Sequence, residues 1–98
     1  MATALDRNIV LTAAGLKVLA QSPLSKVEGM VLWHLVSDLP VTGDIVSKAE
    51  LNTRLSLSEP QVNRAMKHLC ELGVLMRGPK VGVSHHYKLN PAFIRILS

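Results

Sequence analysis

Hydrophobic residues recur at helical spacing in four segments of this 98-residue chain, and each segment is bounded by residues that start or stop helices. Three of the segments open with a Ser followed three residues later by Glu or Gln, which is the sequence signature of a capping box. Stop signals follow at the Ser-Pro pair 22–23, at Pro40 and at Gly73. The predicted helices comprise residues 13–21, 25–39, 47–55 and 58–73.

The segment from Ser58 to Gly73 has the clearest two-sided pattern. Ser58 and Gln61 fit a capping box, Pro60 fits the first turn, and Gly73 suits the left-handed residue that ends a helix. The apolar residues share one face, and they are Val62, Ala65, Met66 and Leu69. Gln, Asn, Arg and Lys occupy the rest of the surface, so we expect one buried face and one polar, basic face.

Short extended segments surround these helices. The predicted strands comprise residues 9–11, 45–46, 74–77 and 85–89. The last two would form a hairpin whose loop, residues 78–84, is basic and rich in Gly and Pro. Asn90-Pro91 ends the hairpin, and we expect one or two helical turns in the apolar residues 92–97. This tail is too apolar to be free, so it either folds back on the first helix or joins a partner subunit.

The order of elements predicts one domain covering residues 1–98, in the mainly α, α+β class. Two capped helices joined by about three residues, within 47–73, form a helix-turn-helix. The hairpin at 74–89 follows as a wing, and the C-terminal tail comprises residues 90–98. The predicted fold is therefore a winged helix-turn-helix, whose second helix commonly enters the DNA major groove.

The net charge of +4 lies in one half of the chain. Residues 1–47 hold three Lys or Arg against four Asp or Glu, whereas residues 48–98 hold eight against three. A basic excess in the half that carries the 58–73 helix suggests a polyanionic partner, although a solvated basic surface would look the same in charge alone. One Trp, one Tyr and one Phe are too few for a platform that stacks single-stranded bases.

From about residue 24 to 91 the chain resembles bacterial winged helix-turn-helix regulators of the MarR-like superfamily. The resemblance rests on four runs, which are Lys48-Ala-Glu-Leu51, Leu55-Ser-Leu-Ser58, Gln61-Val-Asn-Arg-Ala65 and Leu69-Cys-Glu-Leu-Gly-Val-Leu75. Gln61 stands where the family typically has Thr, and Asn63 where it has a small Ser. Both can hydrogen-bond, so the resemblance implies the class of protein but no inherited sequence preference.

A narrower likeness is to the winged-helix proteins of plasmid and phage replication control, the RepL-type initiators. It rests on Leu24-Ser-Lys-Val-Glu-Gly-Met-Val-Leu32 and on Tyr87-Lys-Leu-Asn-Pro91. The chain is short for an initiator, and a small repressor encoded by a mobile element fits its length better.

Two sets of residues are expected to contact DNA. Arg64 is suited to a bidentate contact with guanine, and Gln61 or Asn63 with adenine, while the alternative for Arg64 is a surface ion pair with a neighbouring Glu. The expected contacts from the recognition helix are Ser58, Glu59, Pro60, Gln61, Asn63, Arg64, Lys67 and His68. The expected contacts of the preceding helix and the wing are with the DNA backbone, and for each of them an ordinary exposed surface position is the alternative. These residues are Lys48, Arg54, Arg77, Lys80, Ser84, His85 and His86.

Other classes of function find little support in the sequence. No nucleophile elbow, paired carboxylates or phosphate-binding glycine loop occurs, so we expect no enzymatic activity and no cofactor. The four His and the single Cys have no metal-ligand spacing, and no small-molecule pocket is evident. Without a leader or an apolar run of membrane-spanning length, we expect a cytoplasmic, nucleoid-associated protein.

Together these patterns predict a sequence-specific regulator that binds double-stranded DNA, most simply a repressor of plasmid, phage or other mobile-element genes. Because helix-turn-helix proteins commonly bind two-fold sites, we expect a homodimer built from the N-terminal segment and the tail. An origin-binding replication protein and a winged-helix module for protein interaction remain the alternatives.

Overall fold

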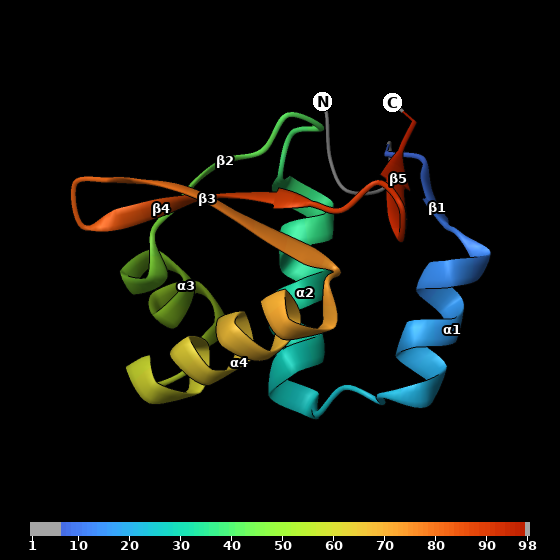
Figure 1. The fold of residues 1–98 in the computed structure, drawn as a ribbon. Helices are drawn as coiled ribbons and strands as arrows, with labels where there is room; N and C mark the ends of the chain where they lie inside the picture. Colours follow the sequence, from blue (N-terminus) through green and yellow to red (C-terminus); the bar gives the residue numbers. More distant parts are fainter. Residues whose placement is uncertain (1–6, 98) are drawn as a thin grey trace.

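The computed structural model describes residues 7–97, in which four helices and five short strands form an α+β structure (Figure 1). The helices are α1 (Ala13–Gln21), α2 (Lys26–Asp38), α3 (Lys48–Leu55) and α4 (Glu59–Leu72). The strands are β1 (Ile9–Leu11), β2 (Asp44–Val46), β3 (Leu75–Val81), β4 (Ser84–Leu89) and β5 (Ile94–Ile96). The predicted helices and the α+β class are confirmed. Residues 1–6 and 98 of the predicted domain lie outside the described residues.

Side-chain caps begin the last three helices, as predicted, with one difference. The capping boxes opened by Ser25 and Ser58 are complete, with hydrogen bonds in both directions. At α3, Ser47 Oγ accepts a hydrogen bond from the Glu50 N–H, but the Glu50 carboxylate pairs with Arg54 at 2.9 Å instead of returning to the cap. The prediction of a third complete capping box was therefore wrong, because an i,i+4 cation competes for the carboxylate.

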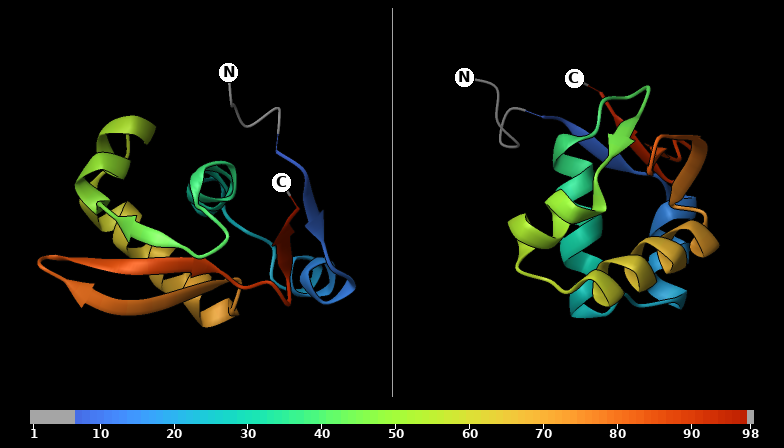
Figure 2. Two further views of the ribbon diagram at one scale, coloured as in Figure 1. Left: turned by 90° about the horizontal axis from the view of Figure 1, so that it is seen from above. Right: turned by 90° about the vertical axis from the view of Figure 1, so that its left-hand side faces the viewer.

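The core forms where α2 crosses α4. Val31, Leu32 and Leu35 of α2 and Val62 and Leu69 of α4 are all buried. Their burial follows from the helical spacing of apolar residues in both segments. Figures 1 and 2 show α2 in the middle of the molecule, with α3 and α4 on one side and α1, β1 and β5 on the other.

A three-residue connection joins α3 to α4. Ser56 ends α3 in the left-handed conformation (φ 55°, ψ 44°), and the Leu57 N–H donates to the Asn52 carbonyl at 3.0 Å. The tight reversal brings the start of α4 close to the end of α3, so both helices contribute side chains to the same surface.

The β3–β4 hairpin is longer than predicted. The two strands, together with β2, form an antiparallel sheet in the order β2-β4-β3. Residues 78–81 belong to β3 and Ser84 to β4, so the predicted loop 78–84 shrinks to a tight turn at Gly82, which has φ +64°. Lys80 therefore lies on a strand opposite His85, after an irregularity that begins at Arg77, and not in a loop. The irregularity accommodates Gly78 and Pro79, which the sequence pattern had indicated as loop residues.

The C-terminal tail is a strand, and the prediction of helical turns there was wrong. β5 pairs antiparallel with β1, with Leu11 opposite Ile94. The alternation of Ile94, Arg95 and Ile96 fits a strand, and β1, more than 80 residues earlier in the chain, supplies its hydrogen bonds. The Thr12 N–H donates to the Phe93 carbonyl at 3.0 Å, so the tail folds back onto the start of α1 within the same chain, which was one of the two expected outcomes.

Candidate functional site

A groove runs between α3, α4 and the β3–β4 hairpin, and we call it the hairpin groove. It consists of two adjoining depressions, of about 650 and 340 Å³, that share Lys48 and Asn63. The other residues lining the first are Met66, Lys67, Cys70, Glu71, Arg77 and Tyr87. The other residues lining the second are Val46, Ser47, Ala49, Asn52, Glu59, Lys80, Val83, Ser84 and His85. The hairpin projects on the side of α3 and α4, away from α1 and β1 (Figure 2).

Four cations from three elements line the hairpin groove. Lys48 is the first residue of α3, Lys67 lies on α4, and Arg77 and Lys80 lie on β3. Within residues 7–97, no carboxylate lies within ion-pair distance of any of these four side chains. Two carboxylates, from Glu59 and Glu71, also line the groove, which leaves a formal charge of +2 on its walls.

His85 lies close to three of the four groove cations. Its ring faces the same side of β4 as Tyr87, with the two ring centroids 6.3 Å apart. Desolvation, followed by the charges of Arg77, Lys80 and Lys48, lowers the pKa of His85 below its usual 6.5. Three cations that act on one imidazole indicate a positive potential concentrated between the hairpin and the start of α3.

The polar residues of α4 face two different sides. Glu59, Asn63 and Lys67 line the hairpin groove. Gln61 and Arg64 line a separate depression against α2. The exposed edge of the helix between these sides also carries Pro60, Arg64 and Lys67. The predicted DNA contacts of α4 are therefore divided between two depressions, one facing the hairpin and one facing α2.

Two of the predicted DNA-contact residues, Ser58 and the base-reading candidate Gln61, are already engaged in the cap of α4. Ser58 Oγ accepts a hydrogen bond from the Gln61 N–H at 3.3 Å, and Gln61 Oε1 accepts one from the Ser58 N–H at 2.9 Å. Asn63 is exposed and makes no such bond. A bidentate contact with adenine needs both the oxygen and the nitrogen of the amide, so Gln61 would have to leave the cap to make it, whereas Asn63 would not.

His68 lies apart from the hairpin groove. Its Nδ1 is 2.5 Å from Glu28 Oε2 on α2. The hydrogen bond from the Ser25 N–H and the contact with His68 lower the pKa of Glu28 against the opposing effect of burial. His68 therefore serves a contact between helices in this structure.

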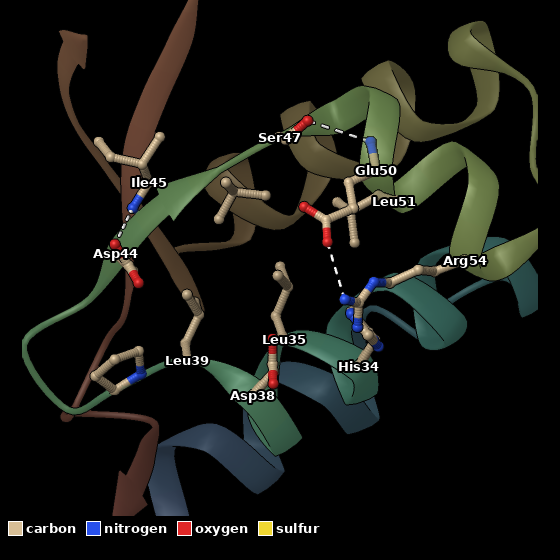
Figure 3. Close-up of a pocket in the computed structure, with 12 residues that line it drawn as sticks. His34, Leu35, Asp38, Leu39, Asp44, Ile45, Ser47, Glu50, Leu51 and Arg54 are labelled. Carbon is tan, nitrogen blue, oxygen red and sulfur yellow. Dashed lines mark hydrogen bonds and ion pairs between the residues drawn. The ribbon is translucent and has the colours of Figure 1, made fainter.

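Arg54 and His86 also lie away from the groove. Arg54 pairs with Glu50 on the far side of α3, beside a depression whose lining includes His34 and Asp38 (Figure 3). His86 projects from the face of β4 opposite His85 and lies against Gly43 and Gly78. Of the fifteen predicted contact residues, Arg54, His86 and His68 lie most clearly apart from the groove cations.

Sequence reasoning missed several residues of the site. Tyr87 and Cys70 line the groove, and burial raises the pKa of both side chains. The alternation of His85 and Tyr87 along a strand could have indicated that they share a face. Val83 is 96% exposed at the hairpin turn, a position that appears only once the turn is known. Nothing in the sequence pattern indicated that Glu28 would contact His68.

Neither a metal site nor a membrane-spanning helix occurs in the described part of the chain. Across residues 7–97, no three His, Cys, Asp or Glu side chains gather in a way that could hold a metal ion. In the same range, every helix is too short or too polar to cross a membrane. Comparison with known proteins finds no matching family model, no significantly similar curated protein and no significantly similar solved structure.

Proposed function

We propose that this protein is a winged helix-turn-helix regulator that binds duplex DNA through α4 and the hairpin groove. In this assignment α3 and α4 are the helix-turn-helix and the β3–β4 hairpin is the wing, in agreement with the resemblance of residues 24–91 to the MarR-like superfamily. The observation that carries the proposal is the set of four cations without acidic partners that converge from α3, α4 and β3 beside an exposed polar helix.

The exposed edge of α4 would lie in the major groove. A helix about 10–12 Å wide fits a groove about 12 Å wide, and its first turns reach the base edges. Asn63 would pair with adenine and Arg64 with guanine, each contact adding about 1–3 kcal/mol of discrimination. Glu59 at the start of the helix is suited to accept a hydrogen bond from cytosine N4.

The cations of the groove would bind the DNA backbone. Lys48 and Lys67 flank α4 on its hairpin side, and Arg77 and Lys80 extend the positive surface along the wing. Such contacts fix the position of the protein without reading sequence, and they make binding sensitive to salt. Repression would follow from occupation of promoter DNA and needs neither a cofactor nor an enzymatic step.

We also propose that the protein binds as a homodimer, since a two-fold site doubles both the base contacts and the phosphate contacts. The tail that the sequence suggested as a dimer element pairs with β1 of its own chain. A dimer built around it would therefore use the outer faces or edges of the β1–β5 sheet and not an exchange of the tail.

Selection of binding sites from random duplex DNA tests the proposal. We expect an enriched motif whose symmetry reports the oligomeric state, and a mobility shift with that motif at physiological salt. Arg64→Ala should lower the affinity for the motif and relax the choice at one base pair by about 1–3 kcal/mol. Lys17→Ala, on α1 and remote from the hairpin, is the matched control and should leave binding unchanged. Failure to bind any duplex at low salt would refute the proposal.

A further inference from the structure

The depression between α2 and α4 is lined by an acidic side chain from α2 and a basic side chain from α4 that do not pair. Glu28 and Arg64 line the same depression, together with Ser25, Val27, Gln61 and Ala65. Both oxygens of Glu28 are already engaged, Oε1 by the Ser25 N–H at 2.9 Å and Oε2 by His68 Nδ1 at 2.5 Å. Because a carboxylate can only accept hydrogen bonds, the proton of this contact is assigned to His68 Nδ1.

Arg64 and His68 are neighbours on α4, four residues apart, and both face α2 near Glu28: Arg64 lines the same depression, and His68 contacts the carboxylate. The Glu28 side chain is only 18% exposed, and a vacant oxygen there would be a better partner for a guanidinium than a fully solvated carboxylate is. In the observed arrangement His68 occupies that oxygen, and no ion pair of Arg64 forms among the described residues.

We propose that His68 is a positioning residue for DNA recognition: by occupying Glu28 it keeps the Arg64 guanidinium available to the DNA. The inference rests on the proposed function, since it assigns Arg64 to the DNA. This role differs from the direct DNA contact that the position of His68 in the sequence suggested. Glu28 acts only as the alternative partner of Arg64, and His68 occupies it.

The variants that test this proposal are His68→Ala, Glu28→Gln and the combination of the two. Gln is the other residue that completes a capping box at the third helical position, so Glu28→Gln removes the charge and leaves the α2 cap intact. Removal of His68 should weaken binding to the selected motif roughly two- to fivefold, the loss expected when a partly exposed ion pair must break first. The same His68→Ala change in the Glu28→Gln background should restore the affinity to within about 1.5-fold of the Glu28→Gln variant.

Three results would overturn the proposal. Equal losses from His68→Ala with Glu28 and with Gln at position 28 would mean that His68 contacts DNA itself or supports the fold. An undiminished affinity of His68→Ala would mean that Glu28 does not capture Arg64. In an Arg64→Ala background His68→Ala should have no further effect, and a further loss there would also contradict the assignment.

A measurement without DNA separates this proposal from the proposed function. In the NMR spectrum of the free protein, the Arg64 guanidinium signals should show slowed exchange with water and slowed rotation in His68→Ala, but not in the wild type or the double variant. Absence of that change overturns the inference whether or not the wild type binds DNA. Absence of DNA binding by the wild type, with the change present, refutes the proposed function. It leaves established that Arg64 binds Glu28 when His68 is removed.

Discussion

Lys80→Ala is the sharpest test of the cationic surface. Lys80 is exposed on β3 opposite His85, has no acidic partner within ion-pair distance among residues 7–97, and is one of the cations that depress the pKa of His85. If the four groove cations each neutralise one phosphate, log K should fall against log salt concentration with a slope of about −3.6 per protomer, at about 0.9 for each contact. Removal of one contact should reduce that slope to about −2.7.

The same relation gives the expected loss of DNA affinity in Lys80→Ala. One contact contributes about 0.9 times the negative logarithm of the salt concentration to log K, so Lys80→Ala should weaken binding about 15-fold at 0.05 M salt and about fivefold at 0.15 M. Because phosphate contacts carry no sequence information, the loss should be equal for the selected motif and for a scrambled duplex.

Fluorescence anisotropy of labelled duplexes between 0.05 and 0.3 M KCl measures both quantities. Lys17→Ala removes an identical charge from α1, on the opposite side of the molecule from the hairpin (Figure 1), and should change neither slope nor affinity. Parallel salt lines for Lys80→Ala and the wild type, or an equal loss in Lys17→Ala, would show that Lys80 does not meet a phosphate.

Further predictions concern stability and pH. Gly15→Ala should lower the free energy of unfolding in urea by about 1–3 kcal/mol, since an added Cβ would lie 2.2 Å from the Phe93 carbonyl oxygen; a stabilised variant would contradict the packing of the tail on α1. Ser56→Gly should raise Tm and add about 0.5–1 kcal/mol, because Ser56 has φ 55°, whereas Ser56→Ala should give no gain. DNA phosphates should raise the depressed pKa of His85, so binding should take up a proton and tighten as the pH falls from about 7 through 6; a pH profile that is unchanged in His85→Gln would exclude this group.

The helices of this protein could be predicted because their signals are local. Ser25 and Ser58 begin their helices within three residues of the partner that completes each cap, and Gly73 ends α4 with φ 87°. The apolar stripe of α4 likewise corresponded to its buried face. Such interactions involve residues close in sequence, so spacing and residue type are sufficient to anticipate them.

The candidate site was only partly predictable, because its composition depends on contacts between distant segments. Lys48, Lys67 and Lys80 converge from three elements, and the sequence indicated their charge but not their convergence. Arg54 is not part of the groove, because it pairs with Glu50 on its own helix. His68 is not part of it either, because it contacts Glu28, forty residues earlier in the chain.

By itself, the sequence determined where the four helices begin and end, which face of α4 is apolar, and that the positive charge gathers in the second half of the chain. These properties follow from hydrogen bonds and periodicity within a few residues. Only the tertiary structure decided that residues 94–96 form a strand, since their partner is β1 at the other end of the chain. It also decided which polar side chains of α4 are free to meet a ligand. The helix cap engages Gln61 and the contact with Glu28 of α2 engages His68, whereas Asn63, Arg64 and Lys67 stay exposed.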